Sequence, residues 1–132
     1  MIREYQWQPV THDQLLLCIR WCQINLELRD WDIKLDTGDR MPREFNGNEP
    51  DSLGMSYSWP NRNRALIWVP IDYLAKQKYN AISCTIHEVI HVMESATGVE
   101  TNELMVRRME PLLYRLYCKE TKIKIAKERH EE

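Results

Sequence analysis

The sequence predicts an α+β domain, in which helices pack on one small β-sheet. Two observations carry this prediction: apolar residues recur at helical spacing near both ends of the chain, and they alternate with polar residues in its middle third. The order of these patterns, a helix, then strands, then further helices, is typical of α+β proteins. With 132 residues, 43% of them hydrophobic and 29% charged, the chain is long enough for one core. We therefore expect a single domain over residues 1–132.

The N-terminal third is expected to contain one helix, one strand and a long loop. Thr11 and Gln14 have the spacing of a capping box, in which each side chain bonds the other residue's backbone N–H. Apolar residues follow at helical spacing, which predicts a helix over 12–28. Alternation over 31–35 predicts a half-buried strand. The stretch 36–54 holds three of the four glycines and has no periodicity, so it is expected to be a loop.

A β-hairpin is predicted in the middle of the chain. Large apolar side chains alternate with small polar ones over 55–59, a polar turn follows over 60–63, and a β-rich run covers 65–69. Pro70 should end the second strand, because proline cannot donate the hydrogen bond that a paired strand needs. A short helix over 72–78 is expected next.

Two longer helices are predicted in the C-terminal half. Asn80 is a suitable N-cap for a helix that continues to about residue 96, and Gly98 is suited to end it. The following helix is expected over 101–119. Pro111 lies inside that pattern and should kink or split the helix, because it lacks a backbone N–H.

Charge and hydropathy exclude several classes of function. The formal net charge is −2 and no basic block occurs, so a nucleic-acid partner is not expected. The charged tail 120–132 alternates in sign and is expected to be solvated. The longest apolar run, 65–71, is far shorter than the roughly 20 residues that span a bilayer, so no membrane partner is expected. The N-terminus lacks the apolar core of a secretory signal. We therefore expect a cytoplasmic protein whose four cysteines are reduced. Cys18 and Cys22, four residues apart, could join a metal site, but small buried apolar residues are favoured at these positions.

The pattern His-Glu-x-x-His at positions 87–91 carries the main chemical signal. His87 and His91 are four residues apart in a predicted helix, so both imidazoles can reach one metal ion. Glu88 would lie beside that ion, where a carboxylate can take a proton from water and pass it to a leaving group. A zinc ion would lower the pKa of the water and polarise a carbonyl. The pattern predicts a zinc-dependent hydrolase with these two metal ligands and Glu88 as general base.

The residues from Thr85 to Met93 resemble the active helix of the zincin metallopeptidases. The wider order of elements is similar to that of short gluzincin-like metallopeptidases of phages and prophages, and distantly to SprT-like domains. This resemblance implies a small zincin-like domain, with an N-terminal helix and short β-sheet before the HExxH helix and a C-terminal helix. It also implies Zn²⁺ as cofactor, a peptide or protein as substrate, and the host cytoplasm as the location if the chain is phage-encoded. The metzincin extension is absent, because Glu94 and Thr97 stand where its glycine and third histidine would be.

A third metal ligand is expected from the helix that follows the motif, because catalytic zinc takes three protein ligands. Glu103 is the first choice, since residues 103–106 resemble the acidic-x-x-aliphatic pattern that carries this ligand in short gluzincin-like proteins. Glu110 is the alternative, because an antiparallel return of the chain brings residues deeper in that helix level with His87. Glu103 could instead form a surface ion pair with Arg107.

The substrate side of the site is predicted more broadly. In zincins a peptide substrate pairs with an exposed sheet edge above the active helix. The run 65–69 is the candidate for that edge, although it could equally be a central strand. Tyr114 and Tyr117 are available to stabilise an oxyanion, and Tyr117 also suits the core. A second hypothesis is a catalytically silent, zinc-stabilised binding or regulatory module on the same scaffold.

Overall fold

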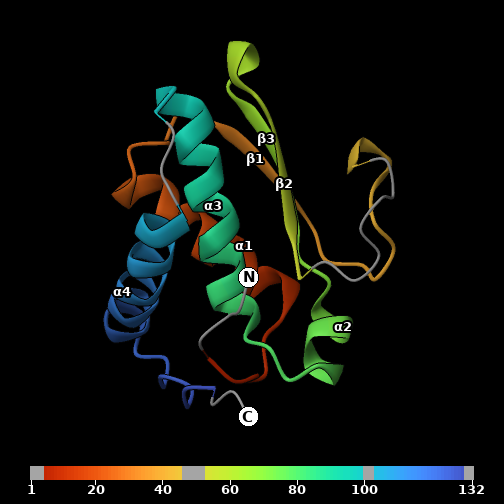
Figure 1. Cartoon of the computed structure of the whole chain (residues 1–132), viewed down its shortest axis with the longest axis vertical. Coiled ribbons are helices and arrows are strands. Elements are labelled where there is room, and N and C mark those ends of the chain that lie inside the picture. The colour runs from red at the N-terminus through yellow and green to blue at the C-terminus, as the bar shows by residue number, and fades with distance from the viewer. Residues whose placement is uncertain (1–4, 46–52, 100–102, 130–132) are drawn as a thin grey trace.

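The computed structural model describes residues 5–45, 53–99 and 103–129, and its elements form the predicted α+β arrangement (Figure 1). A three-stranded sheet packs against helix α3 (Ala81–Thr97), and helices α1 (His12–Asn25) and α4 (Glu103–Thr121) pack on α3 from other sides. This central place explains why eleven of the seventeen residues of α3 are buried. In the part of the chain that the structure describes, no helix is long and apolar enough to cross a membrane.

The sheet consists of β1 (Asp32–Asp36), β2 (Met55–Trp59) and β3 (Arg64–Trp68), in the order β1-β3-β2. Strand β3 pairs in parallel with β1 and antiparallel with β2. Of the two roles considered for the run 65–69, the substrate-binding edge is wrong and the central strand is found, because β3 is hydrogen-bonded on both sides. The edge strand of the hairpin is β2.

One face of the sheet forms part of the hydrophobic core. Successive side chains of a strand point to opposite faces, and residues in register share a face. Ile33 and Ala65 are partners across β1 and β3, and Ile67 lies two residues further along on the same face. All three are buried together with the apolar residues of α3. Burial of this face, at about 25 cal/mol per Å² of apolar surface, holds α3 against the sheet.

The start of α1 and both ends of α3 are set by local residues. The capping box predicted at Thr11 and Gln14 is present at the start of α1. Asn80 accepts a hydrogen bond from the backbone N–H of Ser83 at the start of α3, as its side chain predicted. Gly98 ends α3 in the left-handed conformation, with φ of 69°. These caps fix where the HExxH helix begins and ends.

Helix α4 continues through Pro111, so the predicted split is not found. Proline removes the hydrogen bond to the carbonyl of the residue four positions earlier, Arg107. Arg107 is exposed, so solvent can hydrogen-bond that carbonyl oxygen instead. The helix therefore tolerates the proline, and one unbroken helix covers α3.

The loop before β2 covers part of the outer face of the sheet. The indole N–H of Trp68 donates a hydrogen bond to the carbonyl oxygen of Gly38 (2.7 Å), and a 3₁₀ turn at Arg43–Phe45 brings Phe45 edge-on to Tyr57. Part of the predicted loop, residues 46–52, lies outside the described residues. Helix α2 (Ile71–Lys76) follows β3, as the short helical pattern predicted.

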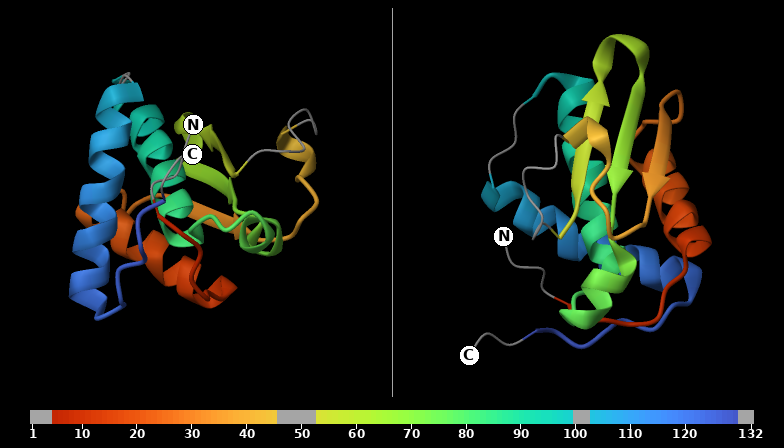
Figure 2. Two further views of the ribbon diagram at one scale, coloured as in Figure 1. Left: turned by 60° about the horizontal axis from the view of Figure 1, so that its bottom comes forward. Right: turned by 90° about the vertical axis from the view of Figure 1, so that its right-hand side faces the viewer.

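The segment after α4 packs against the N-terminal segment and against α4, rather than extending as a solvated helix end. The backbone N–H of Gln6 donates to the carbonyl of Lys127 (2.8 Å), and Tyr5 forms a β-bridge with Glu128. The backbone N–H of Ala126 donates to the hydroxyl of Tyr114 (3.0 Å). Both terminal segments therefore lie side by side at one end of the helices (Figure 2).

Candidate metal centre

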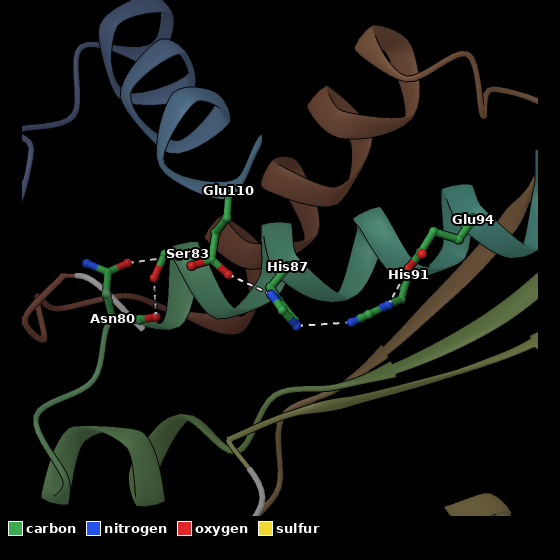
Figure 3. A network of polar contacts seen from close by, with 6 residues as sticks. All are labelled: Asn80, Ser83, His87, His91, Glu94 and Glu110. Carbon is green, nitrogen blue, oxygen red and sulfur yellow. Dashed lines mark hydrogen bonds and ion pairs between the residues drawn. The ribbon is translucent and has the colours of Figure 1, made fainter. Parts of the chain in front are cut away.

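The two histidines of the motif face each other from adjacent turns of α3. Their Nε2 atoms approach within 3.0 Å, as Figure 3 shows. The side chain of His87 is 4% exposed and that of His91 is 39% exposed, so the pair lies at the boundary between the core and solvent. The helical spacing of four residues produces this convergence, as the sequence predicted.

A carboxylate lies behind each imidazole ring. Oε1 of Glu110, which reaches over from α4, is 2.8 Å from Nδ1 of His87. Oε1 of Glu94, one turn further along α3, is 2.6 Å from Nδ1 of His91. Figure 3 shows both contacts directed away from the gap between the rings. The Glu94 contact is a hydrogen bond and favours the proton on Nδ1 of His91, because the carboxylate accepts the hydrogen, whereas the Glu110 contact with Nδ1 of His87 is a close ion-pair contact.

This arrangement of charges fits a cation between the rings. With Nδ1 protonated in each neutral imidazole, both Nε2 atoms present lone pairs to one another at 3.0 Å. Two lone pairs at this distance repel unless a proton or a metal ion lies between them. Zinc binds histidine nitrogen at about 2.0–2.1 Å, so two such ligands in tetrahedral geometry are about 3.3 Å apart. The observed separation needs an adjustment of only a few tenths of an ångström.

Glu88 lies between α3 and the start of the edge strand β2. The side chain is buried, with 4% exposed. A Cβ atom added to Gly54 would lie 3.4 Å from Oε2 of Glu88 and 3.1 Å from the carbonyl oxygen of Trp68. Gly54 has φ of 154°, a conformation that side chains other than glycine rarely adopt. The glycine therefore makes room for the carboxylate beside the strand edge.

Of the two candidates for a third metal ligand, the structure describes the side chain of Glu110 only. Glu110 contacts Nδ1 of His87, the nitrogen on the opposite side of the ring from Nε2. This position suits a group that orients the ring, rather than the ligand role considered from sequence. The side chain of Glu103 lies outside the described residues. Among the described side chains, no group of three or more His, Cys, Asp or Glu is arranged to hold a metal ion.

The two tyrosines considered for oxyanion stabilisation are core residues. Tyr114 is fully buried and Tyr117 is 3% exposed. The hydroxyl of Tyr114 donates to Oε1 of Gln8 (2.5 Å), which ties the N-terminal segment to α4. Burial raises the pKa of both phenols far above the ordinary value of 10.0. Their surroundings indicate a structural role.

Sequence reasoning missed the role of Glu94. Its spacing of three residues from His91 is the signal that could have indicated it, because side chains at i and i+3 are neighbours on a helix. The contribution of Gly54 has no such local signal, since it depends on how the hairpin meets α3.

No known protein family, curated protein or solved structure matches this chain. The geometry of the site therefore carries the functional argument.

Proposed function

We propose that the chain is a zinc-dependent metallopeptidase that hydrolyses peptide bonds. The observation that carries the proposal is the pair of Nε2 atoms 3.0 Å apart, each on a ring whose Nδ1 contacts a carboxylate. Histidine ligands of metal ions commonly have such a carboxylate at the other nitrogen, where it fixes the tautomer and raises the basicity of the ring. The proposal groups the chain with the short gluzincin-like peptidases and places its activity in the cytoplasm.

His87 and His91 would hold the zinc ion, and Glu103 is the proposed third ligand. Helix α4 crosses α3 obliquely, with its N-terminal end toward the C-terminal end of α3 (Figures 1 and 2). Glu103 is seven residues before Glu110, which places both on the same face of α4, about 10 Å apart along the axis. A bound zinc ion would supply a Lewis acid and lower the pKa of a water ligand.

Glu88 is the proposed general base. Its carboxylate would accept a proton from the attacking water and deliver it to the leaving nitrogen of the peptide. The peptide would extend along β2, which within the described chain is paired on one side only. Main-chain hydrogen bonds to this edge would hold the substrate beside Glu88. The substrate class is therefore an extended peptide or an exposed segment of a protein.

Metal content and turnover test the proposal separately. Elemental analysis of the purified chain is expected to give about one zinc per chain, lost in His87→Ala and strongly reduced in Glu103→Ala. Cleavage of a proteome-derived peptide library, read by mass spectrometry, is expected for the wild type and absent in Glu88→Gln. Glu44→Gln, at an exposed position on the 3₁₀ turn, is the matched control and should cleave normally.

Each outcome decides one part of the proposal. A wild type without zinc after refolding with excess metal would overturn the metal centre. Bound zinc with no cleavage, or equal cleavage by Glu88→Gln, would overturn the peptidase reading and support a silent, zinc-stabilised binding module. Zinc retained in Glu103→Ala would exclude this carboxylate as the third ligand and leave the two histidines in place.

A further inference from the structure

The outer face of α4 exposes a concentration of apolar side chains. Ten large hydrophobic residues are exposed in the described part of the chain, and five of them lie on α4 or just after it. These five are Leu104, Met105, Leu112, Leu116 and Ile125, with 43% to 61% of each side chain exposed. Scattered apolar residues are normal on a surface, but a contiguous group marks an interaction site.

This face points away from the candidate metal centre. At 3.6 residues per turn, Leu112 and Lys119 lie about 160° and 180° around the helix from Glu110. Glu110 is buried against His87. In Figure 2 (left), α4 forms one side of the molecule, with α1 and α3 on its inner side. A partner on the outer face would therefore leave the metal centre open.

Two shallow grooves lie one after the other along this face, and Leu112 lines both of them. The first, of about 260 Å³, lies over the N-terminal half of α4, from Leu104 to Leu112. The second, of about 730 Å³, lies between the C-terminal half of α4 and the segment 123–125. Together they extend from Leu104 to Lys119, about 22 Å along the helix axis.

The charges that line the grooves have one sign. Arg108 lines the first groove, and Arg115, Lys119 and Lys124 line the second. None of the described residues that line either groove is acidic. The whole chain has a formal net charge of −2, so the positive charge of this face is opposite in sign to the net charge of the molecule. Such a field attracts a negatively charged partner and repels a positive one.

We propose that this face of α4 binds an acidic amphipathic helix of a partner protein. The helix would be about four turns long, with an apolar stripe over Leu112 and Leu116 and glutamate or aspartate side chains opposite Arg108 and Lys119. A second copy of the chain using the same face would place these cations against one another, which disfavours self-association. The groove between α4 and 123–125 fits the rounded surface of a helix better than a flat lipid surface.

Fluorescence anisotropy with a defined peptide tests this proposal. The probe is a labelled helical peptide of about 18 residues, with leucine at every third or fourth position and glutamate at the flanking positions. We expect binding to the full chain with a Kd below about 100 μM. Leu112→Ser together with Leu116→Ser, and separately Lys119→Glu, are each expected to weaken it at least about tenfold. Binding should also weaken with salt.

Controls distinguish binding at this site from nonspecific hydrophobic binding and from binding of other partners. Leu17→Ser, at an apolar position on α1 that is 65% exposed, should bind the peptide as the wild type does. A peptide with lysine in place of each glutamate should not bind. Circular dichroism checks that every variant is folded. No binding, or equal binding by the groove variants, would overturn the proposal. Preferential binding to vesicles of phosphatidylcholine and phosphatidylglycerol, or a dimer lost in Leu112→Ser, would overturn it in favour of a membrane or a second copy.

Discussion

At the scale of single residues, the carboxylates behind the imidazoles determine what can lie between them. Glu110 and Glu94 each contact an Nδ1 atom, and both Nε2 atoms face one gap. Glu110 is 2% exposed, whereas the side chain of Glu94 is 16% exposed. Electrostatic interactions weaken with access to solvent, so Glu110 should contribute more to the order of the site than Glu94.

Replacing Glu110 should weaken metal binding without removing a metal ligand. In Glu110→Ala the ring of His87 loses the group that fixes its tautomer and orientation, and we expect zinc affinity to fall about 10- to 100-fold. Glu110→Gln keeps an acceptor oxygen and should lose less. Zinc affinity is measured by competition with a chromophoric chelator. Equal affinity in Glu110→Ala and wild type would contradict an orienting role, and a complete loss of zinc would instead indicate a ligand.

Introducing a side chain at position 54 should disturb the site for two reasons. Gly54→Ala forces an alanine into φ of 154° and brings its Cβ to 3.1 Å from the carbonyl oxygen of Trp68 and 3.4 Å from Glu88. We expect a loss of about 1–3 kcal/mol in the free energy of unfolding by urea, together with reduced peptide cleavage. Gly98→Ala is the control, because φ there is also positive but nothing lies within 4 Å of its added Cβ. It should lose stability alone, with cleavage unchanged.

At the scale of elements, α3 is held at its N-terminus by a single buried side chain. The amide oxygen of Asn80 accepts from Ser83 N–H (2.9 Å), and its amide nitrogen donates to the carbonyl of Gln6 (3.0 Å) and to Gln8 (2.6 Å). The N-cap of α3 is therefore also the anchor of the N-terminal segment. The side chain of Asn80 is fully buried, and its hydrogen bond with Ser83 is buried as well.

Two substitutions at Asn80 should separate the cap from the anchor. Asn80→Asp keeps the oxygen that accepts from Ser83 but loses the hydrogen bonds that the amide nitrogen donates, which include one to the hydroxyl of Tyr114 (3.3 Å), while Asn80→Ala loses all of them. We expect Asn80→Ala to cost about 2–4 kcal/mol in the free energy of unfolding, more than the roughly 1 kcal/mol of a cap alone. Thr11→Ala, at the exposed cap of α1, provides that reference. Losses of the same size for Thr11→Ala and Asn80→Ala would show that the anchor contributes nothing.

Elements could be predicted from local patterns, but their pairing could not. Alternation predicted strands at 31–35 and 55–59, and side-chain caps predicted the starts of α1 and α3, because these signals act within a few residues. The hairpin was also predictable, since its two strands are adjacent in sequence. The parallel pairing of β1 with β3 joins residues about 30 apart, and depends on which faces the helices cover. That choice put the run 65–69 in the centre of the sheet and left β2 as the edge strand of the hairpin.

At the scale of the whole molecule, the candidate site could also be predicted only where its residues are close in sequence. His87, Glu88 and His91 lie on one helix, so spacing alone predicted that they share a region. Gly54 comes from the hairpin and Glu110 from another helix, and only the packing of α3 between sheet and α4 brings them together. The sequence could predict the motif for this reason, but not the groups that orient it.

The core between α1 and α4 contains several groups that must stay uncharged. Cys18 and Cys118 are fully buried, and burial raises the pKa of each thiol above its ordinary value of 9.0. The neighbouring thiol of Cys22 raises the pKa of Cys18 further. Burial likewise raises the pKa of Tyr114 and Tyr117. All four shifts have the same direction, so ionisation of each group is disfavoured in the folded chain.

Alkaline solution should therefore unfold this protein more readily than neutral solution. Each of these groups has a higher pKa in the folded chain than in the unfolded chain, so its contribution to stability is complete below the unfolded value and is lost as pH rises above it. We expect the free energy of unfolding to be constant to about pH 8.5 and then to fall, with a slope of up to about 1.4 kcal/mol per pH unit for each group ionised only in the unfolded state.

Tyr114→Phe isolates one part of this pH dependence. The variant loses the hydrogen bond to Gln8 and leaves the N–H of Ala126 without its acceptor, so at neutral pH it should be less stable by about 1–3 kcal/mol. Above about pH 10 its stability should fall less steeply than that of wild type, because one phenol no longer has to ionise. Tyr57→Phe, at a side chain that is 44% exposed, should keep the wild-type slope. Urea unfolding from about pH 7.5 to about pH 11 gives the three slopes. Parallel curves for wild type and Tyr114→Phe would mean that the buried phenol is not part of the alkaline transition.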